Sequence, residues 1–194
     1  HTLLSAQKRL NKQSVLLPWP VLSGCGFLLF KRRGKRILYT SAFCKSPIGP
    51  LLLTANDAGL CGVSLTNILP NGCTQKETPL LQTAAGQIAD YFAGRRKMFS
   101  LPLSPEGTAF QRDVWEALRK IPYGETRTYG QVAQAVGQPR ACRAVGMACH
   151  RNPLLIVVPC HRVIGQNGSL TGFGAGLDAK AFLLQMEKKE AQSL

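Results

Sequence analysis

A thiol and an imidazole stand next to each other in this chain, at Cys160 and His161. They follow the continuous apolar run Leu154–Val158, which is typical of a strand buried on both faces. A cysteine attacks as its thiolate, so it needs a base within reach and an acidic group that orients the base. Glu187, in a helix expected from residue 177 to about 189, is the candidate carboxylate. Because side chains alternate along an extended segment, we expect the thiol and the imidazole to communicate through a bridging water or a bend.

Short helices surround this pair in the second half of the chain. Capping residues and apolar spacing predict three of them: Thr108 to Lys120, Tyr129–Val136 after a Thr128 cap, and Arg140–Cys149. The last two are joined by a turn that contains Gly137, and they form a helix-turn-helix candidate. The second helix of such a motif contacts DNA, so Arg143 and Arg151 are candidate DNA-binding residues.

The first half of the chain predicts a small sheet with one helix. Turn signals separate three strand-like runs, Ile37–Phe43, Pro50–Ala55 and Leu60–Leu65, which predict a three-stranded antiparallel sheet. Residues 67–78 are expected to form a loop. Thr78 then caps a helix that has Pro79 at its first position and runs to about residue 92. The fold class is therefore mixed α/β, with a domain over 37–100, a linker over 101–107 and a second domain over 108–194.

The charge of the chain points to a polyanionic partner. Its 194 residues include 24 Lys and Arg against 10 Asp and Glu, a net charge of +14. Residues 1–40 hold eight of the basic residues and no acidic one, whereas residues 126–177 are free of acidic residues altogether. Five arginines fall in this acid-free stretch, which is therefore expected to face phosphate: Arg127, Arg140, Arg143, Arg151 and Arg162.

Composition narrows the class of protein further. Hydrophobic residues make up 45% of the chain, enough for a core, so a disordered or fibrous protein is excluded. Residues 13–30 are uncharged and largely apolar, but their prolines and glycines favour an unassigned extension over residues 1–36 rather than a signal peptide or a membrane span. Seven cysteines and three histidines fit neither a disulfide framework nor a zinc finger, so we expect reduced thiols, no metal site and a cytoplasmic protein, or a nuclear one in a eukaryote.

The motif Pro159-Cys160-His161-Arg162-Val163 resembles the active-site motif of the O6-alkylguanine-DNA alkyltransferases, and of bacterial members more than animal ones. The resemblance covers about residues 37–190. Further matches are Gly107–Arg112, Ile121–Gly124, Thr128–Ala133, Arg143–Gly146 and Thr171–Phe173. It implies a ribonuclease H-like first domain, followed by a winged helix-turn-helix domain that carries the active-site cysteine.

The resemblance implies single-turnover repair with no cofactor. Cys160 would take an alkyl group from O6 of guanine, and from O4 of thymine, and keep it as a stable thioether. A water between Cys160 and His161, with Glu187 holding the imidazole, would supply the thiolate. Tyr129 would offer a proton to the departing base. The expected partner is double-stranded DNA that contains O6-alkylguanine. The protein is expected to be a monomer that does not bind a membrane.

The resemblance also implies how the damaged base is reached. The second helix of the motif would enter the minor groove, and Arg143 would fill the gap that the extruded base leaves. The DNA-binding residues would be Arg143, Arg151, Thr128, Tyr129, Ala144 and Gly146. The substrate pocket would be formed by Val158, Pro159, Asn152, Phe173, Gly174 and Lys180. Phe173 stands where many members have tyrosine, and Gly174 where some have serine.

Two other classes of function fit the residues. A damage-binding relative would flip the base without repairing it, but such relatives lack the nucleophile that Cys160 supplies. A cysteine hydrolase built from Cys160 and His161 would turn over repeatedly and would need no basic helix.

Overall fold

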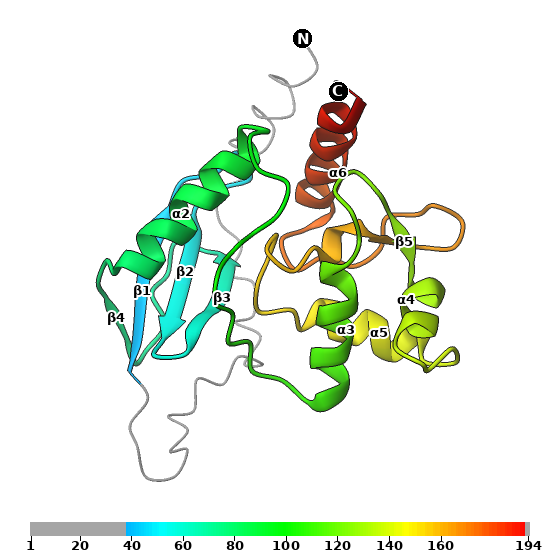
Figure 1. The fold of residues 1–194 in the computed structure, drawn as a ribbon, viewed down its shortest axis with the longest axis horizontal. Helices are drawn as coiled ribbons and strands as arrows, with labels where there is room; N and C mark the ends of the chain where they lie inside the picture. Colours follow the sequence, from blue (N-terminus) through cyan, green and yellow to red (C-terminus); the bar gives the residue numbers. More distant parts are fainter. Residues whose placement is uncertain (1–37, 193–194) are drawn as a thin grey trace.

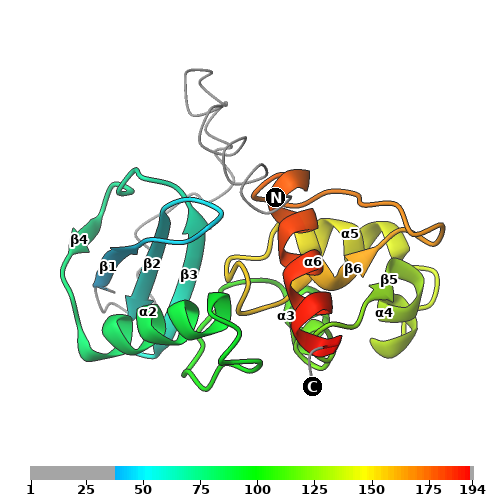
Figure 2. The same cartoon turned by 90° about the horizontal axis from the view of Figure 1, so that it is seen from above.

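The computed structural model describes residues 38–192, so the predictions for the extension at residues 1–36 lie outside it. Two units lie side by side, one a sheet with a single helix and the other a group of short helices (Figures 1 and 2). This is the mixed α/β fold class that the sequence predicts. Over the described residues, no helix is long and apolar enough to cross a membrane.

A four-stranded sheet forms the first unit. Its strands are β1 (Tyr39–Cys44), β2 (Leu51–Asn56), β3 (Gly59–Leu65) and β4 (Cys73–Gln75), in the order β3-β2-β1-β4. The first three form the antiparallel sheet that the turn signals predict. The prediction of three strands is nevertheless wrong, because β4 lies within the segment predicted as a loop and pairs in parallel with β1. Its three residues are too few to show the alternation by which a strand is recognised.

Helix α2 (Pro79–Phe92) covers one face of this sheet (Figure 2). The Thr78 hydroxyl accepts a hydrogen bond from the Leu81 amide. Pro79 occupies the first turn, where an N–H group would have no partner within the helix, so proline can be accommodated there. The predicted bounds of this helix are confirmed. Its buried apolar side chains recur at three- and four-residue spacing and join the core with those of β2: Leu81, Ala84, Ile88 and Tyr91 with Leu51, Leu53 and Ala55.

The outer edge of β3 is hydrogen-bonded to later segments of the chain. The backbone pairs are Leu60 with Pro102 and Ser104, and Val63 with Pro153 and Leu155, at 2.8 to 3.0 Å. The segment predicted as a linker therefore runs beside β3 instead of crossing open solvent. The same strand also holds the residues that lead into Cys160.

The second unit contains four helices: α3 (Ala109–Arg119), α4 (Tyr129–Ala135), α5 (Cys142–His150) and α6 (Leu177–Gln192). Thr108 and Thr128 cap α3 and α4, each in a reciprocal capping box with a glutamine three residues later. Helix α5 begins two residues later than predicted and has no side-chain cap. Strand β5 (Arg127–Thr128) pairs in parallel with β6 (Val163–Ile164) beside the helix-turn-helix formed by α4 and α5 (Figure 2).

The apolar run before Cys160 is buried, but it does not form a strand. Residues 154–158 fold into tight turns, and the Val157 amide donates to the Leu155 carbonyl at 2.8 Å around Ile156. Ile156 has φ +71°, a conformation that is strained for a β-branched residue. The strand prediction is therefore wrong, because an apolar run reports burial and does not distinguish a strand from a compact buried loop.

Candidate active site

Cys160 begins a 3₁₀ turn over Cys160–Arg162, and its side chain is only 4% exposed. This turn provides a bend between Cys160 and His161, one of the two arrangements expected for the pair. The Asn152 amide nitrogen donates to Cys160 Sγ at 3.1 Å and to the Val158 carbonyl at 2.8 Å. Burial raises the pKa of the Cys160 thiol, while the Asn152 hydrogen bond and the Lys180 ammonium lower it. The net direction is upward, so the thiol needs a base in order to react at neutral pH.

His161 is fully buried, and its Nε2 lies 2.9 Å from Glu187 Oε1. Because a carboxylate can only accept, Nε2 donates this bond and the neutral ring has its lone pair on Nδ1. Nδ1 is buried and has no hydrogen-bond partner among residues 38–192. Burial lowers the pKa of His161 against the raising effect of Glu187. The ring is therefore neutral at neutral pH, with Nδ1 ready to accept a proton.

Five hydrogen bonds converge on the buried carboxylate of Glu187. Oε1 accepts from the Tyr91 hydroxyl at 2.6 Å, from His161 Nε2 at 2.9 Å and from Arg162 Nη2 at 2.9 Å. Oε2 accepts from Arg162 Nε at 2.9 Å and from the Gly124 amide at 3.2 Å. Burial would raise the pKa of Glu187, but the bonds from His161 and Arg162 outweigh it and lower the pKa to about 2. The carboxylate is therefore ionised at neutral pH and fixes the imidazole.

Arg162 belongs to this network and does not face phosphate. It is 5% exposed, binds Glu187 through two nitrogens and donates from Nη1 to the Ile121 carbonyl at 2.6 Å. Arg127 forms an ion pair with Glu125 at 2.8 Å. The prediction of five phosphate-facing arginines is thus wrong for Arg162, because its guanidinium binds the buried carboxylate of Glu187, which is distant in sequence. Three of the five are exposed, namely Arg140, Arg143 and Arg151.

Sequence reasoning missed Tyr91 and Gly124, which both bind Glu187. Gly124 lies in a motif that supports the family resemblance, so a signal for it existed. It has φ +79°, and a Cβ there would lie 2.8 Å from Ala191 Cβ, so the close approach of its amide to Glu187 requires glycine. Tyr91 lies on the buried face of α2, where an aromatic residue is ordinary, so the sequence carries no signal for its role.

Tyr129 and Lys180 both hold the segment between β6 and α6. The Tyr129 hydroxyl donates to the Thr171 carbonyl at 3.3 Å and accepts from Thr171 Oγ1 at 3.2 Å. Lys180, expected in the substrate pocket, is fully buried and donates from Nζ to the same carbonyl at 2.8 Å and to that of Val163. Burial raises the pKa of Tyr129, so its phenol is protonated at neutral pH.

The other predicted pocket residues differ in exposure. Phe173 is 9% exposed, and its ring meets the His161 ring edge to face, with centroids 6.2 Å apart. Val158 and Pro159 are buried in the loop before the thiol, whereas Gly174 is exposed. The structure therefore brings Phe173 against the imidazole and leaves Gly174 at the surface.

Helix α5 presents an exposed face with the predicted DNA-binding residues. Arg143 and Ala144 are exposed on it, and Arg151, the residue that follows the helix, is exposed as well. Met147, which sequence reasoning did not select, is 52% exposed on the same helix. Gly146 is half-buried, and a Cβ there would lie 3.8 Å from the Tyr129 ring. Thr128 serves as the cap of α4, so its hydroxyl accepts from the Gln131 amide.

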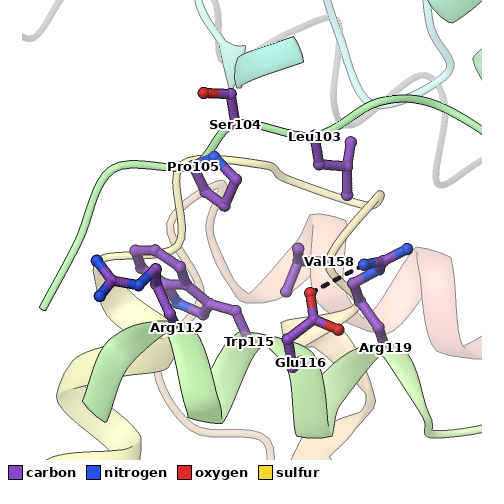
Figure 3. A pocket seen from close by; sticks show the side chains of 8 residues that line it. All are labelled: Leu103, Ser104, Pro105, Arg112, Trp115, Glu116, Arg119 and Val158. Atoms are coloured by element: carbon purple, nitrogen blue, oxygen red, sulfur yellow. Dashed lines mark hydrogen bonds and ion pairs between the residues drawn. The ribbon is translucent and has the colours of Figure 1, made fainter. Parts of the chain in front are cut away.

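A separate cavity of about 300 Å³ lies between the 103–105 segment and α3 (Figure 3). The lining residues are Leu103, Ser104, Pro105, Arg112, Trp115, Glu116, Arg119 and Val158. Figure 3 shows the ion pair between Glu116 and Arg119, at 2.9 Å, on the α3 side of the cavity. Val158 is shared with the predicted substrate pocket, but Cys160 does not line this cavity. Within the described range, no cluster of three or more His, Cys, Asp or Glu side chains could hold a metal ion.

Two family descriptions match consecutive parts of the chain. The 6-O-methylguanine DNA methyltransferase ribonuclease-like domain matches residues 37–105, and the DNA binding domain of the same family matches residues 109–189. A methylated-DNA--protein-cysteine methyltransferase of Methanosarcina acetivorans is 50% identical over 151 residues, which are 75% of this chain and 96% of that protein. The constitutive methylated-DNA--protein-cysteine methyltransferase of Bacillus subtilis is 48% identical over 158 residues, 77% of this chain and 94% of that protein.

A solved structure agrees with these relatives. The crystal structure of Mycobacterium tuberculosis OGT in complex with DNA is similar with a TM-score of 0.71 and 43% identity, over 78% of this chain and 93% of that chain. The match to the DNA binding domain covers the buried thiol, imidazole and carboxylate. The two family matches together span most of the chain, and on these grounds, with the relatives that are about half identical to it, the chain belongs to the 6-O-methylguanine DNA methyltransferase family.

Proposed function

We propose that this chain repairs DNA by moving an alkyl group from O6 of guanine to Cys160, once per molecule. The observation that carries the proposal is the buried thiol of Cys160, bonded by Asn152, next to a His161 ring held by an ionised Glu187. A nucleophile, a neutral base and a carboxylate that orients the base are the groups that thiol chemistry requires. Relatives named methylated-DNA--protein-cysteine methyltransferases support the choice of acceptor and substrate.

Proton transfer from the thiol is assigned to His161. Its Nε2 is occupied by Glu187, so Nδ1 is the nitrogen that takes the proton, through a bridging water. The imidazolium that forms is stabilised by the Glu187 carboxylate, which Arg162 and Gly124 hold in place. The relay offsets the effect of burial, which by itself keeps Cys160 protonated.

The transfer itself is a single displacement. Cys160 Sγ forms a bond to the alkyl carbon as the bond from that carbon to guanine O6 breaks, and the electron pair of the broken bond leaves with the guanine. Tyr129, protonated and adjacent to Thr171, offers a proton to the departing base. One proton leaves the thiol and one reaches the guanine, so the products are an S-alkylcysteine and an intact base. A thioether does not hydrolyse, which makes the reaction single-turnover without a cofactor. The same displacement applies to O4 of an alkylated thymine.

DNA binding is assigned to the exposed face of α5. Arg143, Ala144 and Arg151 combine positive charge with a small residue that allows close approach to the minor groove. Arg143 fills the space left by the flipped base, which a duplex requires because a stacked base cannot reach a buried thiol. The protein acts on double-stranded DNA as a monomer.

Methylation of the thiol tests the proposal directly. After incubation with an excess of a duplex that contains O6-methylguanine, we expect a single methyl group on Cys160 and one repaired base per protein molecule, measured by peptide mass spectrometry and by counting repaired duplexes. Tight binding without methylation would instead indicate a protein that only binds damage. Repair of several bases per molecule would indicate a hydrolase.

Removal of the Arg143 side chain tests base flipping. We expect Arg143→Ala to slow repair of the duplex by about 10- to 100-fold, because the flipped state loses a few kcal/mol of support, and to leave the reaction with free O6-methylguanine base unchanged. Rate constants for the two substrates check this. Arg143→Lys is the matched control, because it keeps the charge but not the shape. Equal losses on both substrates, or full repair by the lysine variant, would contradict the flipping role.

A further inference from the structure

A tyrosine of the first domain contacts the catalytic carboxylate of the second. Tyr91, near the end of α2, is completely buried, and its hydroxyl donates to Glu187 Oε1 at 2.6 Å. The same hydroxyl lies 3.5 Å from His161 Nε2. Tyr91 falls in the ribonuclease-like part of the family match, whereas His161 and Glu187 fall in the DNA-binding part. The relay is thus completed across the boundary between the two.

We propose that Tyr91 is a positioning residue for alkyl transfer, holding the Glu187 carboxylate in the orientation that fixes the His161 ring. The inference rests on the proposed function, since it concerns the same relay. It also assigns the first domain a part in the chemistry, besides whatever it contributes to folding.

The phenol is placed to act on the imidazole through the carboxylate. Tyr91 and His161 donate to the same oxygen, Oε1 of Glu187, so each of these two hydrogen bonds weakens the other. Burial and the charge of Glu187 raise the pKa of Tyr91 well above its ordinary value, so it remains a donor throughout the working pH range. Without the hydroxyl, Oε1 would bind the imidazolium more strongly, and apart from His161 itself only Arg162 and the Gly124 amide would orient the carboxylate.

Aromatic neighbours hold the Tyr91 ring independently of its hydroxyl. The rings of Phe92, Phe99 and Tyr123 lie 5.4, 5.6 and 6.0 Å from it, measured between centroids. A phenylalanine at position 91 would therefore keep the packing and lose only the hydrogen bond. Tyr123 provides a matched control, because its hydroxyl is buried but has no hydrogen-bond partner within the described part of the chain.

We expect Tyr91→Phe to lower the rate of alkyl transfer about tenfold, as for the loss of a hydrogen bond to a charged group. The loss should be equal for a methylated duplex and for free O6-methylguanine base, with unchanged affinity for the duplex. The acidic limb of the pH–rate profile, which reports the protonation of His161, should move to higher pH, a change that a purely structural role would not produce. Tyr123→Phe should match the wild type in rate and in pH profile.

The inference is overturned if Tyr91→Phe keeps the wild-type rate and pH profile, or if Tyr123→Phe loses as much activity. Failure of the wild type to methylate Cys160 in the same assay would instead reject the proposed function. If Tyr91→Phe does not fold, the inference can still be tested by a measurement on the wild type. The Tyr91 hydroxyl proton should give a slowly exchanging, strongly downfield NMR resonance, and exchange as fast as that of an exposed tyrosine would also overturn the inference.

Discussion

Cys160→Ala is expected to abolish alkyl transfer while leaving the affinity for DNA close to that of the wild type. In the proposed mechanism the thiol forms the bond to the alkyl carbon, and Cys160 is buried as the first residue of the 3₁₀ turn. The proposed DNA contacts lie instead on the exposed face of α5, at residues such as Arg143, and at Arg151 directly after it. Mass spectrometry of the protein and titration of a methylated duplex at fixed salt measure the two properties separately.

Cys44→Ala is the control for this variant. Burial also raises the pKa of the Cys44 thiol, but this side chain lies at the end of β1 in the sheet, in the other unit of the molecule. We expect it to retain full transfer, because thiol chemistry here depends on the neighbouring imidazole and not on burial. Methylation that persists in Cys160→Ala, on any other cysteine, would contradict the assignment of the nucleophile.

Glu187→Gln is expected to reduce both the rate of transfer and the stability of the fold. The amide has one acceptor oxygen, and its NH₂ group would face donors that the carboxylate now satisfies. Arg162 would stay buried without its counter-charge, which costs about 3–5 kcal/mol of unfolding free energy. The loss of an orienting group behind the base should slow transfer by about 10²- to 10⁴-fold. Urea unfolding and single-turnover rates measure the two effects.

The pH dependence of stability gives a second measure of the same carboxylate. The pKa of Glu187 is about 2 in the folded chain, against about 4.3 for an unfolded glutamate. Its contribution to stability is therefore complete above about pH 4.5 and is lost as the pH falls towards 2. The wild type should lose unfolding free energy steeply over this range, and Glu187→Gln should lose much less.

Glu116→Gln is the matched control for the buried carboxylate. Glu116 also binds an arginine, at 2.9 Å, but both side chains are exposed on α3. Exposed ion pairs contribute about 0–1 kcal/mol, so this variant should keep the stability and the pH dependence of the wild type. Equal behaviour of the two variants would show that the Glu187 network does not stabilise the fold.

The sequence could predict those structural features that depend on residues close together in the chain. Thr78, Thr108 and Thr128 each begin a helix because the hydroxyl of a threonine bonds an amide three residues further on, a contact that needs no tertiary structure. The adjacent Cys160 and His161, and the helix that carries Glu187, can be recognised for the same reason. His161 and Glu187 do lie in contact, as expected.

Contacts between distant segments could not be predicted in this way. Tyr91 bonds Glu187 across 96 residues, and the packing that brings them together leaves no mark on the local pattern. Strand β4 depends on its pairing with β1, because a run of three residues is too short to form a strand alone. At Ile156 an apolar sequence adopts a positive φ, which surrounding contacts impose against the preference of the residue.

The hydrogen bonds along the outer edge of β3 have a consequence for the behaviour of the protein in quantity. An exposed strand edge can recruit a strand from another molecule and start aggregation. Here Leu60 and Val63 already bind the chain's own 102–104 and 153–155 segments, and the strand at the opposite edge, β4, is only three residues long. A repair protein consumed one molecule per lesion must be present in as many copies as there are lesions. One covered edge and one short edge therefore reduce the tendency of those copies to join edge to edge.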